Sequence, residues 1–170
     1  MTIESTVPAA KTVRYPGEEL PAPPPFAIDI PEDFVATAAP RLLALVQPKV
    51  KADKFQPSLT VTADLIPASI EPAAVLNPML DEAVKRPEGE LVTPATEQGS
   101  HQAAGSVRFA VSDVSGPVSL GQSLSIHLAP DALSNGMRYA FSVSATWDAN
   151  NSHDVGATLR AIQDSFRFNA

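Results

Sequence analysis

The sequence MRYAFSVSATW, residues 137–147, contains the longest regular alternation of apolar and polar side chains in this chain. Every odd position in it is apolar: Met137, Tyr139, Phe141, Val143, Ala145 and Trp147. Because successive side chains of a β-strand point to opposite faces, this period predicts a long strand with one buried face. We expect this strand at the centre of a sheet, with its other face solvated or lightly packed.

Two further alternating runs precede this strand, at residues 107–111 and 124–128. Turn residues separate the runs, with Gly116-Pro117 after the first and Asn135-Gly136 after the second. Tight turns of this kind join antiparallel neighbours. The second half of the chain therefore predicts an antiparallel meander.

A helix is predicted after the meander, at residues 152–163. Apolar residues line one face of it at helical spacing, namely Val155, Leu159 and Ile162. Ser152 is suited to cap its first turn, because a serine hydroxyl accepts a hydrogen bond from a free backbone N–H. Phe166 and Phe168 then predict a short closing strand or a packed tail.

The first half contains shorter strand signals. Residues 26–30 alternate, and the Pro-Glu-Asp-Phe sequence at 31–34 predicts a turn. Residues 41–46 form a mostly apolar run between two prolines, which predicts a buried strand. Residues 58–66 alternate again and include threonines, which favour strands.

Residues 71–86 have apolar side chains at helical spacing, and Pro72 suits a first helical turn. Pro78 lacks an N–H and lies inside the pattern. Two interpretations remain open: a kinked helix, or a turn at 72–76 followed by a helix at 78–86. Residues 90–98 are polar and contain a proline, so they predict a strand at the edge of the sheet.

Strands and helices that do not alternate regularly predict the α+β class. We expect a single antiparallel β-sheet flanked by two or three α-helices. Residues 26–170 form one α+β domain in this interpretation, and residues 1–25 form a proline-rich N-terminal arm. The arm is expected to be disordered or to lie along the surface; the alternative is a ligand for a groove that recognises proline-rich peptides.

Composition excludes several classes of function. The net charge of −7 and the pI of about 4.8 disfavour nucleic acid and anionic membrane surfaces as partners. The absence of cysteine excludes disulfides and thiolate chemistry. The chain has no basic N-terminal region, no following apolar run and no integral membrane segment, so we expect a cytoplasmic protein without a signal peptide.

No catalytic, cofactor-binding or metal-binding motif is present. His101, His127 and His153 share no ligand spacing and are expected at the surface. The neighbouring carboxylates are expected to be solvated, and they are Glu18-Glu19, Glu32-Asp33, Asp81-Glu82 and Glu88 with Glu90. Many serines occur, but no nucleophile elbow. The sequence therefore predicts a protein that is not an enzyme and has no cofactor.

Two features each have a structural interpretation and an alternative as a contact for a protein partner. Lys49, Lys51 and Lys54 form a positive cluster in an acidic chain, which is either a solvated loop or a contact for an acidic partner. Trp147 is the only tryptophan and is expected in the core or at its rim; the alternative is an exposed partner anchor.

Three segments resemble the PsbP-like superfold, which includes a photosystem extrinsic subunit, the DcrB proteins and the actinobacterial LpqN-type lipoproteins. Residues 26–34 resemble its opening strand and turn, residues 65–86 its passage from strand to helix, and residues 137–168 its last long strand, helix and final strand. The resemblance implies a mostly non-enzymatic binding or assembly protein, and it carries over no functional residue. The Ala, Val and Pro content is typical of a high-GC actinobacterium.

We therefore expect a non-catalytic accessory factor or chaperone that binds another protein, linked to a secretion or envelope system. The alternative is a small-molecule or lipid carrier with a cavity between sheet and helix. The sequence singles out no partner-binding residues. A homodimer through the sheet edge near residues 90–98 is a further expectation, although a proline and charges there favour a protected edge.

Overall fold

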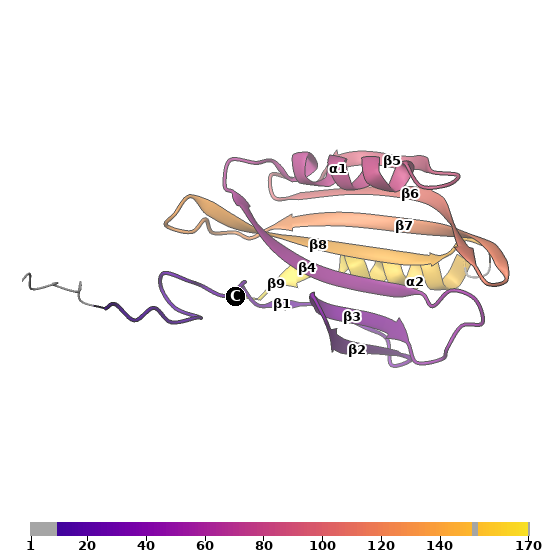
Figure 1. The fold of residues 1–170 in the computed structure, drawn as a ribbon, viewed down its shortest axis with the longest axis horizontal. Coiled ribbons are helices and arrows are strands. Elements are labelled where there is room, and N and C mark those ends of the chain that lie inside the picture. Colours follow the sequence, from indigo (N-terminus) through magenta and orange to yellow (C-terminus); the bar gives the residue numbers. More distant parts are fainter. Residues whose placement is uncertain (1–9, 151–152, 170) are drawn as a thin grey trace, which may run out of the picture.

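The computed structural model describes residues 10–150 and 153–169 of the chain. Within these residues, seven strands form an antiparallel sheet in the order β2-β3-β4-β8-β7-β6-β5, and two very short strands form a second sheet (Figure 1). The described elements are, in chain order, β1 Phe26–Ala27, β2 Phe34–Ala39, β3 Leu42–Pro48, β4 Ser58–Pro67, α1 Pro72–Val84, β5 Glu90–Glu97, β6 Gln102–Asp113, β7 Gly116–Leu128, β8 Met137–Asp148, α2 His153–Asp164 and β9 Arg167–Phe168.

The strand β8 lies at the centre of the large sheet, as its alternation predicts. It pairs with β4 along one side, from Ser58 opposite Thr146 to Pro67 opposite Met137, and with β7 along the other. β6, β7 and β8 form the predicted meander. All three are at least as long as the alternating runs, because neighbouring polar residues also join the hydrogen-bonded ladder.

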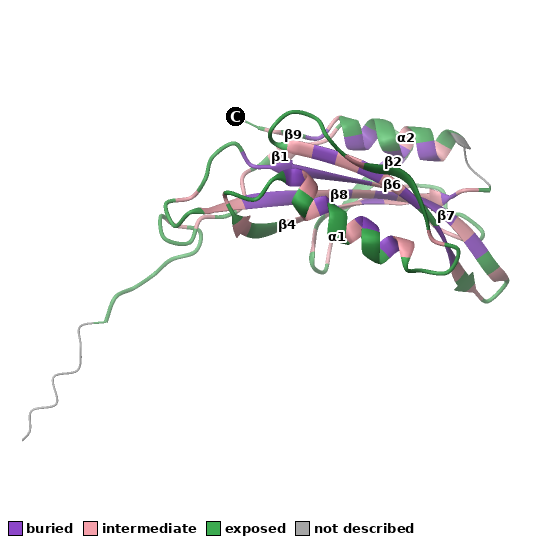
Figure 2. Cartoon of the chain, turned by 90° about the horizontal axis from the view of Figure 1, so that it is seen from above, coloured by how far each residue is buried: buried purple, intermediate pink, exposed green. Residues whose placement is uncertain are grey.

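The two helices cover opposite faces of the sheet, and Figure 2 shows their buried positions turned towards it. Under α1, Leu80 belongs to one core with Ile126 of β7. Under α2, Leu159 belongs to a second core with Phe141 of β8. Because side chains alternate along β8, Phe141 faces α2 whereas Ala140 joins the core under α1. The polar residues on this second face, at positions 138, 142, 144 and 146, are half-buried, so the face is lightly packed rather than solvated.

The prediction of a single sheet is wrong. β1 and β9 form a separate two-stranded sheet in which Phe26 lies opposite Phe168. Phe166 stacks on Phe26 with ring centroids 5.3 Å apart, and Phe168 meets Phe141 edge to face at 5.1 Å. This aromatic cluster joins the beginning and the end of the domain over the α2 face. Its pairing depends on contacts between residues far apart in sequence, which no local pattern encodes.

The region before β4 also differs from the prediction. The sequence predicts a turn at residues 31–34 and a strand at 41–46, and it assigns no element to the residues between them. The chain instead forms a hairpin of β2 and β3, and Arg41 in its turn has a φ of 64°. β3 is not fully buried, since Leu43 is 44% exposed whereas Val46 is fully buried. The small residues of β2 alternate too weakly to mark a strand.

α1 is a single helix that contains Pro78, so the interpretation with a separate turn is wrong. Pro78 and Ala74 are both exposed. Because the proline ring removes the donor that would bind the carbonyl of Ala74, that carbonyl is left to water rather than buried without a partner. The helix therefore tolerates the proline on its solvent side.

The N-terminal arm lies partly outside the described residues, which begin at residue 10. Residues 10–25 form neither helix nor strand. The hydroxyl of Tyr139 donates a hydrogen bond to the carbonyl of Pro21 at 2.8 Å, and the backbone N–H of Asn169 donates to the carbonyl of Pro25 at 3.1 Å. The last part of the arm is thus tied to the domain. The division at residue 26 stays a prediction.

Candidate functional site

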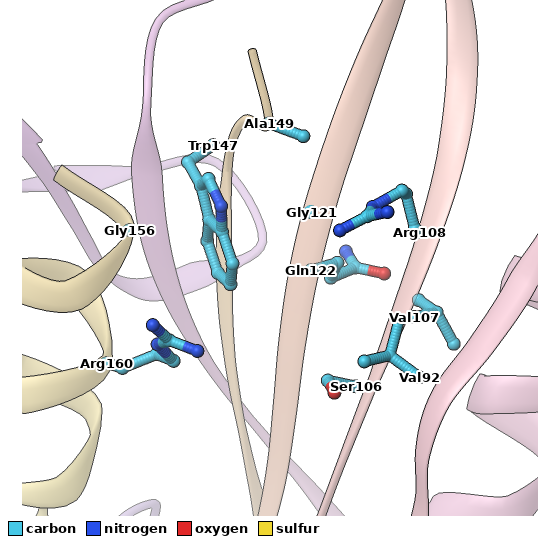
Figure 3. A pocket seen from close by; sticks show the side chains of 10 residues that line it. All are labelled: Val92, Ser106, Val107, Arg108, Gly121, Gln122, Trp147, Ala149, Gly156 and Arg160. Carbon is cyan, nitrogen blue, oxygen red and sulfur yellow. The ribbon is translucent and has the colours of Figure 1, made fainter. Parts of the chain in front are cut away.

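Trp147, near the end of β8, lies between two glycines of neighbouring elements (Figure 3). Gly121 is its cross-strand partner on β7, and Gly156 belongs to α2. A Cβ atom at residue 121 would lie 2.7 Å from the indole Nε1, and one at residue 156 would lie 2.8 Å from it. Neither glycine has a positive φ, so both are needed for space rather than for backbone conformation.

A pocket of about 190 Å³ opens beside this tryptophan, between α2 and strands β6 and β7. Arg160 reaches it from α2, and its guanidinium carbon lies 5.5 Å from the centroid of the indole. Arg108 reaches it from β6 on the other side, as Figure 3 shows. Ser106 and Val92 also line the pocket. The pocket is thus lined by the guanidinium groups of Arg108 and Arg160 together with the indole of Trp147.

A second hollow, of about 500 Å³, lies near the aromatic cluster and is lined by both His101 and His127. His127 is only 7% exposed, and its ring lies 4.4 Å from that of Phe166. Burial lowers the pKa of His127 from 6.5 to about 4, because the charged imidazolium loses its hydration. The prediction that His127 is a surface residue is therefore wrong.

His127 and Ser125 form a buried hydrogen bond of 3.0 Å between Nε2 and Oγ. A serine nucleophile also needs a base with a pKa near the working pH and exposure to substrate. Ser125 is only 4% exposed, and a histidine with a pKa of about 4 is a weak base near neutral pH. The hydrogen bond between Ser125 and His127 instead gives each of these two buried polar side chains a partner inside the protein.

The other candidate residues lie apart from one another. His101 is exposed, and the side chain of His153 lies outside the described residues, as does Ser152. The eight predicted surface carboxylates are all exposed. Lys49, Lys51 and Lys54 are exposed in the loop after β3, and Trp147 is at the rim of the core, as expected. Among the described residues, no group of three or more potential ligands is placed to hold a metal ion.

The sheet has two edges of different character. β5 lies at one edge, as residues 90–98 predict, and it contains Pro94, two glutamates and two shifts of register. β2 lies at the other edge and contains neither proline nor charge. Sequence reasoning missed β2 altogether. It also missed the Trp147 pocket, although glycine inside a strand or a helix is a signal of close approach by another group.

The sheet order, the two helices and their faces define an α+β protein of the PsbP-like fold. The structure is similar to that of LpqN of Mycobacterium tuberculosis, a protein involved in cell envelope biogenesis, with a TM-score of 0.66, 15% identity and coverage of 88% of this chain and 86% of that one. It is also similar to cyanobacterial PsbP from Synechocystis, with a TM-score of 0.52, 14% identity and coverage of 85% and 86%.

These likenesses confirm the predicted resemblance at the level of the fold. No protein-family model matches the chain, and no curated protein matches it at a significant level. In the part of the chain that the structure describes, no helix has the length and apolar character needed to cross a membrane.

Proposed function

We propose that the chain is a non-catalytic accessory protein that binds an extended segment of a partner protein along β2. The observation that carries the proposal is the open edge of this strand. β2 pairs with β3 on one side, and no strand within the described residues pairs with its other side. An open edge presents backbone N–H and C=O groups that can pair with an added strand.

The edge formed by β2 lacks the usual protection against such pairing. Proteins protect edge strands with lysine, proline, inward-pointing charges or strong bulges. The sequence of β2 is FVATAA, with a single irregularity of register between Thr37 and Ala39. Val35 is 40% exposed and Thr37 is also exposed. A strand of this length spans about 20 Å, which is an ordinary length for a paired strand.

The opposite edge supports this assignment by contrast. Pro94 removes a donor from β5, and Glu90 and Glu97 place negative charge near its two ends. The same sheet thus has one protected and one unprotected edge. A partner strand is expected at β2, and the predicted contact near residues 90–98 is disfavoured.

The cellular context of the proposal comes from the likeness to LpqN, whose fold this chain shares. We propose that the partner belongs to a system of the cell envelope. A binding role is supported by the chemistry of the buried Ser125–His127 pair, which is poorly suited to catalysis. The Lys49, Lys51 and Lys54 cluster lies close to the start of β2, since the backbone N–H of Lys49 donates to the carbonyl of Asp33 at 2.8 Å.

Site-specific photo-crosslinking tests the proposal. A photoreactive amino acid is placed at Thr37 on β2 and, as the matched control, at Thr96 on β5, and both proteins are expressed in the native host. We expect Thr37 to crosslink to one partner, at neighbouring positions of a single segment, and Thr96 to give no such product. Thr37→Lys should then weaken binding of that purified partner at least tenfold, and Thr96→Lys should not.

Equal crosslinking from the two edges, or unchanged affinity of Thr37→Lys for the partner, would contradict the proposal. A crosslink from Thr37 to a second copy of this chain would replace the partner by a homodimer. Size-exclusion chromatography with light scattering distinguishes that result, because a homodimer is seen with the purified protein alone.

A second candidate function is that of a small-molecule carrier, favoured by the hollow of about 500 Å³ at His127. This volume lies within the range of about 300–1,000 Å³ that is usual for ligand pockets. The space under α1 and α2, in contrast, is occupied by buried side chains. Native mass spectrometry of protein purified from the host checks this candidate, which requires a bound molecule that is lost on unfolding.

A further inference from the structure

We propose that the pocket beside Trp147 binds a small organic anion. The oxyanion group of the ligand contacts Arg108 and Arg160, and its apolar part lies against the indole of Trp147. This site lies between α2 and the strands β6 and β7, whereas the proposed protein contact lies on β2. The inference is therefore independent of the proposed function.

The charge of the pocket points to an anion. Within the described part of the chain, neither Arg108 nor Arg160 has a carboxylate within ion-pair distance. Both are exposed at the pocket, and an arginine guanidinium carries a positive charge in proteins. The whole chain has a net charge of −7, whereas the charged side chains that line this pocket are the two arginines. Guanidinium groups bind carboxylates and phosphates with two parallel hydrogen bonds.

The indole supplies a fixed apolar wall. The backbones of Gly121 and Gly156 hold it from two sides, since any side chain at either position would occupy the space of the ring. Glycine is unfavourable inside both a helix and a strand. β7 and α2 nevertheless each contain a glycine where they contact the tryptophan. The close contact with both backbones holds the indole ring in place before a ligand binds. A preorganised wall of this kind reduces the entropic cost of binding.

The size of the pocket limits the ligand. About 190 Å³ is smaller than the usual pocket for a drug-sized molecule, and it suits one oxyanion group with a short chain or a small ring. Ser106 lines the pocket, and its hydroxyl can donate to an oxyanion. Glu90 lies opposite Arg108 in the β5–β6 pair and is the nearest competing charge on that strand pair. A larger or doubly branched anion is not expected to fit.

The protein contains its own probe for this site, because Trp147 is its only tryptophan. Indole fluorescence is followed during titration with cyclohexanecarboxylate, with its neutral amide and with inorganic phosphate, none of which absorbs with the indole. We expect a saturable change with the carboxylate and no change with the amide. Phosphate, which has the charge but no apolar part, should bind more weakly than the carboxylate.

Charge variants assign the response to the two arginines. Arg108→Gln and Arg160→Gln should each weaken carboxylate binding about tenfold or more, as expected for loss of a hydrogen bond to a charged group. Arg41→Gln, in the hairpin at the other edge of the sheet, is the matched control and should leave affinity unchanged. Glu90→Gln should strengthen binding.

Several outcomes would overturn the inference. A response to the neutral amide equal to that of the carboxylate would remove the role of charge, and phosphate binding as tightly as the carboxylate would remove the role of the indole. The absence of any saturable response in the wild-type protein, or equal affinity in Arg108→Gln, Arg160→Gln and Arg41→Gln, would remove the site itself. Circular dichroism of each variant verifies that the fold is intact.

Discussion

Gly156 of α2 lies so close to Trp147 of β8 that a Cβ atom at residue 156 would stand 2.8 Å from the indole Nε1. The helix and the central strand thus approach each other through a backbone and a ring. This contact sets the position of the N-terminal part of α2 over the sheet. It also forms one wall of the pocket that Arg108 and Arg160 enter.

The first prediction concerns Gly156→Ala. Helix propensity alone would stabilise the protein by roughly 1 kcal/mol. Because the added methyl group meets the rigid indole, we expect a net loss of about 1–3 kcal/mol in the free energy of unfolding, measured by urea denaturation. In a Trp147→Leu background the same substitution should be neutral or stabilising. A stabilised Gly156→Ala single variant would contradict the close packing.

The second prediction concerns pH and His127. Its pKa is 6.5 when unfolded and about 4 when folded, so the unfolded chain binds the extra proton between these values. The contribution of His127 to the free energy of unfolding is therefore fully present above about pH 6.5. It is lost as the pH falls towards 4, by roughly 3 kcal/mol in total. Urea denaturation at a series of pH values measures this decline.

Two variants isolate the contribution of His127 from that of the carboxylates. His127→Gln should flatten the pH dependence between pH 6.5 and 4 relative to the wild type, because it has no titrating group. His101→Gln removes an exposed histidine from the same hollow and should retain the wild-type dependence. Identical curves for wild type and His127→Gln would show that burial does not shift this pKa.

The third prediction concerns the proline inside α1. Pro78→Ala restores a donor for the carbonyl of Ala74 and removes a ring from an exposed position. We expect the free energy of unfolding to rise by about 1–3 kcal/mol in urea denaturation. Asn77→Ala, at the neighbouring exposed position, is the control and should change it by less than about 0.7 kcal/mol. A loss of stability in Pro78→Ala would mean that the proline itself packs favourably.

The fourth prediction concerns the attachment of the arm. Tyr139→Phe removes the hydrogen bond to the carbonyl of Pro21. The free energy that holds the arm on the domain should fall by about 1 kcal/mol. We expect faster trypsin cleavage after Arg14, because the arm is released more often. Tyr15→Phe changes an exposed tyrosine, 66% accessible, and should leave the rate unchanged. Equal cleavage rates in the two variants would show that the Tyr139 contact does not restrain the arm.

The elements that could be predicted are those whose own sequence carries their pattern. The central strand β8 and the helix α2 have regular periods over many residues, and turn residues separate β6, β7 and β8. β2 could not be predicted, because its alanines fit a strand, a helix or a loop equally well. The continuity of α1 through Pro78 depended on which side of the helix faced solvent, and the sequence alone left that open.

The candidate sites also depend on contacts that no local sequence pattern encodes. The sequence predicts Trp147 in the core or at its rim, but nothing nearby in the sequence indicates that Gly121 and Gly156 meet its ring. The sequence predicts His127 at the surface, because it alternates with leucine on the polar side of β7. The structure buries that side under Phe166, which comes from the end of the chain. The resulting low pKa therefore depends on a contact that the local sequence does not contain.

Local side-chain period by itself determined the α+β class, the meander and the central position of β8, because alternation acts through the geometry of a single strand. The tertiary structure alone decided which polar residues are buried, which sheet edge is open and which charges share a pocket. Those features arise where segments far apart in the chain are packed together, and only the balance of packing and solvation over the whole molecule selects those contacts.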